Sequence, residues 1–241
     1  MEYNNVLYEK YKKNNTSQYG EDGIVEEIFN RLGIQKGICV DIGASNGKWY
    51  SNTFSLVEKG WEAYEIEGSE NEELKKLAID YPNIKYRFCY VSDEDNERNI
   101  NKLLKQMDCP KEIDFMSLDI DSIEYWIWDT LEYNPKIMCI EIEPRNYPTD
   151  MIFHDRNPKL SKSEKQKLYN SQNLTGFGPM YQLAKKKGYF LICHTISNLF
   201  FIRNDLIQDL KYPEVTDIKE LTNFNPLYLS TEDKRRWKKH E

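Results

Sequence analysis

The stretch "CVDIGASNGKWYSNT", Cys39 to Thr53, decides the fold. Apolar residues run into an acid, Asp41, two glycines follow at Gly43 and Gly47, and the chain then turns polar. An apolar run that ends in a glycine turn is typical of a buried strand followed by a helix. Because glycine permits positive φ and lets a ligand approach the backbone, the turn is either structural or a ligand loop.

Strand-like and helical patterns alternate on both sides of this turn. The alternation predicts an α/β fold in which parallel strands are joined by right-handed crossovers, with helices on both faces of the sheet. An amphipathic helix is predicted within residues 17–33, before the first strand. The expected strands are 36–43, 61–68, 83–92, 113–121 and 135–144, and the helices between and after them are 51–60, 69–81, 96–107, 122–133 and 178–188.

The alternation stops after the fifth predicted strand. Residues 144–176 are polar and rich in Pro, Asn and Lys, and they follow the carboxyl end of a central strand, where open α/β sheets bind ligands. We expect a substrate-binding insertion there. Residues 189–203 then read as two strands joined by a tight turn, which predicts an antiparallel C-terminal hairpin at a sheet edge.

The bulk composition restricts the classes of partner. The 241 residues carry a formal net charge of -7, and the only dense basic run is "KRRWKKH" near the C-terminus, so no nucleic-acid partner is expected. No apolar run reaches the roughly 18 residues that span a bilayer, and residues 1–15 are polar throughout. Five single cysteines without a CxxC pair favour reduced thiols and a cytoplasmic location.

The chemistry of the turn favours a cationic ligand over a dinucleotide. Only two glycines are present instead of the three of a dinucleotide fingerprint, and the carboxylate of Asp41 disfavours a pyrophosphate. Glu67, at the tip of the next strand, is positioned to accept both hydroxyls of a ribose, although a surface acid near a helix start is the alternative. Val91 and Ser92, at the end of the third predicted strand, are candidates to cover an adenine with Asp93 near its exocyclic amine, and a plain turn is the alternative.

Several motifs together resemble a class I S-adenosylmethionine-dependent methyltransferase, and more narrowly the FkbM-like family. They are "SQYGEDG", "VDIGASNGKWYSNT", "GWEAYEIEG", "DFMSLDIDSIEYWIWDTL", "IMCIEIEP" and "KKKGYFLICHTISNLFFIRNDL", and they span roughly residues 17–206. The resemblance implies a Rossmann-like sheet of seven strands, mostly parallel, whose last strand is antiparallel.

The same resemblance assigns the cofactor site. The glycine turn would wrap the methionine part of S-adenosylmethionine, and Glu67 would hold its ribose. Asp119 would contact the cofactor's amino group if it binds no metal. The full set of predicted cofactor-binding residues is Asp41, Gly43, Ala44, Gly47, Asn52, Thr53, Glu67, Gly68, Val91, Ser92 and Asp119.

Two acid pairs end the fourth and fifth predicted strands. Asp119 and Asp121 alternate on one strand end, and Glu141 and Glu143 on the next, so up to four carboxylates would converge. Such a cluster needs a proton, a cation or a basic partner. Methyl transfer to a hydroxyl also needs a base and gains from a metal that lowers the hydroxyl pKa.

The resemblance to metal-dependent sugar O-methyltransferases assigns roles to these acids. Asp119 would be a Mg²⁺ ligand and Asp121 the base, with Glu141 and Glu143 as further metal ligands. Those enzymes place adjacent acids after the next strand, whereas the acids here alternate, which leaves the metal open. Helix capping by Asp121 or Ser122 is the structural alternative.

Other candidates for the site are weaker. His154, in the predicted insertion, is a second possible base or a bystander, and His194 lies in a strand-like run that favours packing. Tyr125 and Trp128 share one helix face, where core packing is the default. "SQYGEDG" is either a lid with Gln18 or Tyr19 as contacts, or a simple helix entry.

The sequence thus predicts one methyltransferase domain over residues 1–241. Its expected parts are an entry or lid (1–36), a cofactor core (37–143), the insertion (144–176), a C-terminal helix and hairpin (177–206) and a tail (207–241). The predicted reaction is O-methylation of a sugar or glycoconjugate. The alternatives are a non-catalytic module that binds S-adenosylmethionine, a methyltransferase of non-sugar hydroxyls, and an NAD-dependent enzyme. The oligomeric state is not readable.

Overall fold

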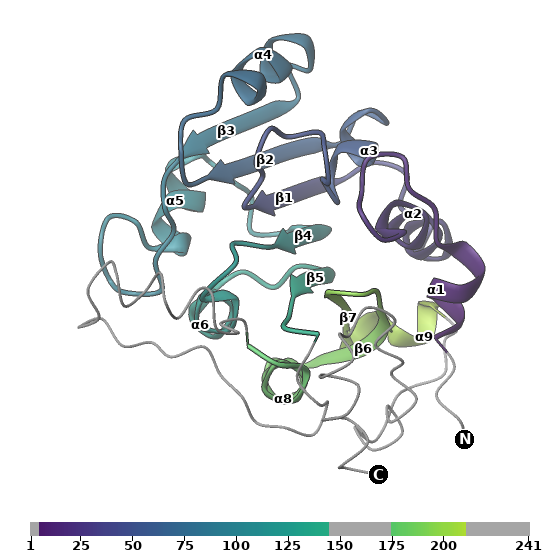
Figure 1. Cartoon of the computed structure of the whole chain (residues 1–241). Coiled ribbons are helices and arrows are strands. Elements are labelled where there is room, and N and C mark those ends of the chain that lie inside the picture. The colour runs from purple at the N-terminus through teal and green to yellow at the C-terminus, as the bar shows by residue number, and fades with distance from the viewer. Residues whose placement is uncertain (1–4, 145–174, 211–241) are drawn as a thin grey trace, which may run out of the picture.

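Seven strands form one mixed sheet in the computed structural model, which describes residues 5–144 and 175–210 (Figure 1). The strand order is β3-β2-β1-β4-β5-β7-β6. Neighbours among the first five strands pair in parallel, whereas β7 pairs antiparallel with both β5 and β6. The bounds are β1 Ile38–Ile42, β2 Glu62–Glu67, β3 Ile84–Phe88, β4 Phe115–Leu118, β5 Ile137–Glu141, β6 Tyr189–His194 and β7 Asn198–Arg203.

This topology confirms the predicted fold. The antiparallel hairpin is present, and β6 forms the edge of the sheet while β7 lies between β6 and β5. The chain runs outward from β1 to β3 and then crosses back to β4, which pairs with β1, so the strand order changes direction in the middle of the sheet. At such a point the connecting loops diverge and leave a crevice beyond the carboxyl ends of the strands.

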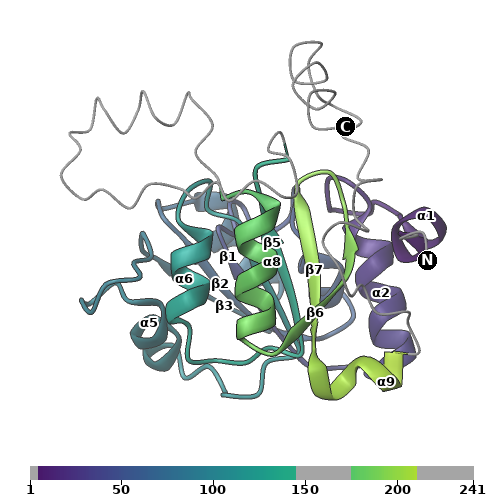
Figure 2. The ribbon, with the colours of Figure 1, turned by 90° about the horizontal axis from the view of Figure 1, so that it is seen from below.

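Helices cover both faces of the sheet, as Figure 2 shows from below. On one face, α5, α6 and α8 pack over a cluster that includes Val40, Met116 and Ile140. On the other face, α2 packs over Cys39, Phe115 and other buried side chains. The bounds are α1 Val6–Tyr11, α2 Glu21–Leu32, α3 Phe54–Val57, α4 Glu72–Asp80, α5 Ile100–Gln106, α6 Glu124–Thr130, α8 Phe177–Lys186, η1 Asn204–Leu206 and α9 Ile207–Leu210.

Local chemistry explains where these helices begin and end. The side chains of Asn71 and Asn99 accept backbone N–H groups at the starts of α4 and α5. The helix predicted over 51–60 is a single turn, because the amides of Lys59 and Gly60 bond three residues back and end the α-helical ladder. The strand predicted over 83–92 ends at Phe88, where the chain leaves the sheet.

All five cysteines are free thiols, and four of them are buried. In the described parts of the chain no helix is long and apolar enough to cross a membrane.

One carboxylic acid lies inside the sheet without polar partners. Glu65, in β2, is fully buried, and neither of its oxygens has a hydrogen-bond partner among the described residues. Burial, with Asp41 nearby, raises the pKa of Glu65 well above its ordinary value. Burial therefore favours the protonated form of Glu65 in the folded protein.

This burial predicts a pH dependence of stability. Above the ordinary pKa of 4.5 the unfolded chain ionises Glu65 while the folded chain keeps its proton, so the free energy of unfolding falls as pH rises. One proton corresponds to a slope of about 1.4 kcal/mol per pH unit. Glu65→Gln is expected to flatten this fall, measured by urea denaturation at pH 5.5, 6.5 and 7.5. The exposed Glu58→Gln is the control, and equal slopes for Glu65→Gln and the parent would contradict the prediction.

Candidate functional site

The carboxyl ends of β1, β2, β4 and β5 open into a cavity of about 880 Å³. Its size lies within the range of small-molecule sites, roughly 300–1,000 Å³. The change of strand order between β1 and β4 lies at its centre, as expected for an open α/β sheet. The cavity therefore occupies the position where the sequence placed a ligand.

The cavity wall is strongly acidic. Its described residues include no Lys, Arg or His. Carboxylates gathered in this way repel one another and favour a cationic ligand, a bound proton or a metal. The six acids of the wall are Asp41, Glu67, Asp119, Asp121, Glu141 and Glu143.

The glycine turn packs against the neighbouring loops without a gap. The amides of Gly43 and Ala44 both donate to the carbonyl of Ile66, at 2.9 and 3.2 Å. Gly43 has φ 91°, and a Cβ added there would lie 1.6 Å from the carbonyl oxygen of Asp119. No other residue fits at Gly43, because both its φ and its contact exclude a side chain.

Asp41 is held at the floor of the cavity by two hydroxyl groups. Thr53 Oγ1 and Ser51 Oγ donate to the same oxygen, Oδ2, at 2.8 and 3.2 Å. Burial raises the pKa of Asp41 to about 6, with Asp119 and Glu67 adding to the rise. Ser51 Oγ also accepts the amides of Thr53 and Phe54, both at 3.1 Å, at the start of α3.

Glu67 is oriented by the backbone of two loops. Its Oε2 accepts the amide of Ser45 at 2.8 Å, and its Oε1 accepts the amide of Ser69 at 3.2 Å. Each carboxylate oxygen has a second lone pair, so both can accept a further hydrogen bond. The side chain is thus fixed at the cavity wall as an acceptor for two donors.

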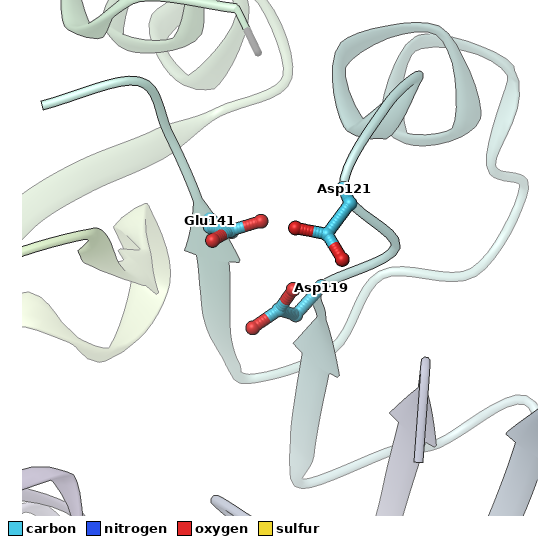
Figure 3. Close-up of side chains that lie close together, drawn as sticks. All are labelled: Asp119, Asp121 and Glu141. Atoms are coloured by element: carbon cyan, nitrogen blue, oxygen red, sulfur yellow. The ribbon is translucent and has the colours of Figure 1, made fainter. Parts of the chain in front are cut away.

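Three of the predicted acids meet at the other side of the cavity. Asp119 follows β4, Glu141 ends β5 and Asp121 lies in the loop before α6, and their carboxylates point toward one another in Figure 3. One carboxylate oxygen from each residue lies within 4.8 Å of the others. Glu143 lines the cavity but is not part of this cluster.

A proton is held within the cluster. Burial and the nearby Asp119 raise the pKa of Glu141 to about 11, and a hydrogen bond between the two side chains adds to this rise. Burial also raises the pKa of Asp119. Both shifts favour a proton on this pair of carboxyl groups. Asp121 is the exposed member of the three.

The loop that carries Asp121 is shaped by Glu124, a residue that the sequence did not indicate. Glu124 Oε1 accepts the amides of Ile120 and Ser122, at 3.0 and 2.9 Å, and burial raises the pKa of Glu124 to about 7. Asp121 has φ 58°, and α6 begins at Glu124 without a side-chain cap. Helix capping by Asp121 or Ser122, the alternative drawn from sequence, is wrong.

The segment before α2 closes one side of the cavity. The amides of Asn15, Thr16 and Ser17 all donate to Asp22 Oδ2 at 2.8 Å. Burial raises the pKa of Asp22, but these three donors outweigh burial and lower it below its ordinary value. The bonds fix the loop that brings Gln18 and Tyr19 to the cavity wall, where the lid interpretation placed them.

A second acid ties the same segment to the sheet. Glu21 Oε1 accepts Thr195 Oγ1 at 2.7 Å and Asn198 Nδ2 at 3.1 Å. Glu21 Oε2 accepts the amide of Tyr19 at 2.6 Å. Glu21 thus joins the loop beside the cavity to the start of β7.

Most of the predicted cofactor residues line the cavity, and three do not. Gly47 faces Glu65 and Leu74 beneath the turn, and Thr53 supports Asp41 from behind. Ser92 accepts bonds from its own loop, from the Glu94 amide and the Asn96 side chain. The residues that do line it are Asp41, Gly43, Ala44, Asn52, Glu67, Gly68, Val91 and Asp119.

The two histidine predictions and the helix prediction have different outcomes. His154 lies outside the described residues, as does most of the predicted insertion. Burial lowers the pKa of His194 to about 4, in keeping with the predicted packing. Trp128 is fully buried against Tyr189 and Phe201, which confirms core packing for this residue, and Tyr125 is partly buried against the same cluster.

Sequence reasoning missed the aromatic residues of the cavity wall. Trp49, Tyr50 and Tyr90 all line it, and 62%, 72% and 64% of their surfaces are exposed. Trp49 and Tyr50 stand inside the quoted glycine turn, but an aromatic pair in a loop has no periodicity that separates it from a core contact.

Comparisons with known proteins find similar structures only. No family model matches the sequence, and no curated protein matches it. A Burkholderia thailandensis 1,6-didemethyltoxoflavin-N1-methyltransferase with bound S-adenosylhomocysteine is 13% identical, with coverage of 73% of this chain and 72% of that chain and a TM-score of 0.43. A putative S-adenosyl-L-methionine-dependent methyltransferase from Methanococcus maripaludis is 17% identical, with coverage of 75% and 83% and a TM-score of 0.40.

A third similar structure has a different activity. The [4+2]-cyclase SpnF is 10% identical, with coverage of 75% of this chain and 63% of that chain and a TM-score of 0.44. At such identities and TM-scores these likenesses carry no conclusion about activity. The function is therefore argued from the cavity itself.

Proposed function

We propose that this protein is an S-adenosylmethionine-dependent O-methyltransferase that acts on a hydroxyl of a sugar or glycoconjugate. The observation that carries the proposal is the acidic cavity at the carboxyl ends of the strands, with six carboxylates and no basic side chain among its described residues. A ligand that brings a sulfonium, an ammonium and a ribose diol supplies cations and hydrogen-bond donors to such a wall. A dinucleotide pyrophosphate would bring two negative charges to the same place.

The cofactor fits the wall residue by residue. Glu67, fixed by two amides, accepts the two ribose hydroxyls. Asp41 accepts the ammonium through Oδ1, since its Oδ2 already holds two hydroxyls. Gly68 and Val91 line the adenine end. The cofactor's carboxylate needs hydrogen-bond donors, and the described wall has no basic residue to supply them. We assign this role to the side-chain amide of Gln18, which lines the cavity.

Methyl transfer then needs the acceptor oxygen in line with the sulfonium. When bound, S-adenosylmethionine would supply an electrophilic methyl group, whose transfer to the acceptor oxygen would leave S-adenosylhomocysteine. Asp121, the exposed acid of the cluster, takes the hydroxyl proton. Asp119 and Glu141 already share a proton, which leaves Asp121 as the acid suited to act as base.

The cluster also fits a divalent cation. Three carboxylates with oxygens within 4.8 Å form an oxygen-only donor set of the kind that Mg²⁺ accepts. Asp119, Asp121 and Glu141 are the residues that would hold it, and Glu143 lies outside the set. A bound cation would supply Lewis-acid stabilisation of a deprotonated hydroxyl.

Cofactor binding is the direct test of the proposal. Isothermal titration calorimetry is expected to show binding of S-adenosylhomocysteine and no binding of NAD. Glu67→Ala should weaken the S-adenosylhomocysteine affinity by roughly 10- to 100-fold, because hydrogen bonds to a charged group are lost. Glu70→Ala, an exposed acid on the same loop, is the matched control. Binding of NAD without binding of S-adenosylhomocysteine would contradict the proposal.

The role of Asp121 separates catalysis from binding. Asp121→Asn keeps the size of the side chain but removes the base, so turnover should fall by about 10²- to 10⁴-fold while S-adenosylhomocysteine affinity stays within about twofold. The exposed Asp80→Asn is the control for charge. Turnover equal to that of the parent protein would remove Asp121 from the mechanism.

The metal is tested by calorimetry in two buffers of different ionisation enthalpy. Because Glu141 holds a proton at neutral pH, Mg²⁺ binding is expected to release about one proton. Glu141→Gln should abolish the Mg²⁺ heat and leave S-adenosylhomocysteine binding unchanged. Turnover that is undiminished in EDTA, together with no heat of Mg²⁺ binding, would exclude the metal. Asp121 would then be the only group that activates the acceptor hydroxyl.

A further inference from the structure

Two large aromatic side chains at the cavity wall are exposed to solvent. Trp49 is 62% exposed and Tyr50 is 72% exposed, and both line the cavity that holds the carboxylate cluster. The other Trp residues with described surroundings, such as Trp61 and Trp128, are almost wholly buried or packed among neighbours. Exposed aromatic surface beside a polar cavity is typical of a binding site.

The loop holds this pair in place instead of leaving it to collapse onto the protein. Asn46 Oδ1 accepts the amides of Lys48 and Trp49, at 3.1 and 2.9 Å. Tyr50 has φ 61°, a left-handed conformation that a bulky residue rarely adopts. The next residue, Ser51, is anchored by its bond to Asp41. Strain of this kind persists where surrounding contacts impose it, and it gathers at ligand sites.

We propose that Trp49 and Tyr50 form a platform for the apolar face of an uncharged pyranose ring, the acceptor of the methyl group. The inference rests on the proposed function and extends it to a binding site and a substrate class. A pyranose ring presents C–H groups on its face and hydroxyls at its edge. The aromatic rings take the face, and carboxylates of the same wall, such as Asp121 and Glu143, accept the hydroxyls.

The charge of the wall decides against an acidic sugar. Six carboxylates line the cavity and no basic residue is among its described lining residues, whereas a single ammonium group, Lys48 Nζ, lies 6.0 Å from the centre of the Trp49 ring. An anionic acceptor would add to the repulsion among these acids, whereas a neutral ring contributes only hydroxyl donors.

The adenosine end of the cavity has an aromatic residue of its own. Tyr90 lies against Gly68, where an added Cβ would approach its ring to 2.6 Å, and its hydroxyl bonds Ser69 Oγ at 2.6 Å. Tyr90 is thereby tied to the loop that carries Glu67, the residue assigned to the ribose. Trp49 and Tyr50 remain available to the acceptor.

The test measures saccharide binding to protein saturated with S-adenosylhomocysteine. The probes are the methyl glycosides of glucose, galactose and mannose and the matching uronates. Their binding is measured by saturation-transfer NMR and calorimetry. At least one neutral glycoside is expected to bind more tightly than its uronate. Trp49→Ala and Tyr50→Gly should each weaken that binding by about five- to tenfold.

The controls separate the platform from the fold and from the cofactor. Tyr86→Ala removes a half-exposed tyrosine that is not part of the cavity wall, and it should leave saccharide affinity unchanged. Tyr50→Gly relieves the left-handed strain, so its melting temperature should not fall. S-adenosylhomocysteine affinity should stay within about twofold in both platform variants.

Three results would overturn the proposal. The first is a lower S-adenosylhomocysteine affinity in the platform variants, which would assign Trp49 and Tyr50 to the cofactor. The second is saccharide binding that is absent in the parent protein or unchanged in the variants. The third is uronate binding as tight as the binding of neutral glycosides. Failure of the parent protein to bind S-adenosylhomocysteine would instead overturn the proposed function itself.

Discussion

Repulsion among carboxylates at the carboxyl edge of the sheet is the constraint on which the rest of the site depends. Parallel pairing of β1, β2, β4 and β5 brings their terminal acids to one edge, and burial weakens the screening by water. The protein meets this constraint in three ways. Hydroxyls hold Asp41, backbone amides hold Glu67, and a proton is shared between Asp119 and Glu141. What remains is a negative wall that a cationic ligand would stabilise.

The supporting residues lie outside the cavity centre and are themselves mostly acids. Asp22 gathers three amides of the N-terminal loop, Glu21 ties that loop to β7, and Glu124 holds the turn before α6. Backbone N–H groups in tight turns donate readily to a carboxylate, so an acid can fix a loop without a basic partner. The arrangement orients the wall without adding any positive charge to its described residues.

The fold could be read from the sequence because its signals are periodic. Apolar runs ending in acids, separated by helical patterns, specify parallel strands, and the run 189–203 specifies the hairpin. The site was readable only where chemistry follows from a strand end, as for Asp41, Glu67 and Asp119. The sequence wrongly indicated that Gly47 and Ser92 line the cavity. Loop residues near a strand end have the same polar or glycine-rich pattern whether they face the cavity or not. Glu124 and Trp49 depend on loop conformation, which no periodicity encodes.

Gly43 joins the two halves of the site into one unit. A Cβ added at Gly43 would lie 1.6 Å from the carbonyl oxygen of Asp119, so the glycine turn and the β4 tip are in close contact. The amide of Asp119 also bonds the carbonyl of Ile42, which fixes the same pair of strands. In the proposed function, Asp41 lies on the cofactor side and Asp119 on the acceptor side of this contact. The absence of a side chain at Gly43 is therefore what allows the glycine turn and the backbone of Asp119, a member of the carboxylate cluster, to lie in contact.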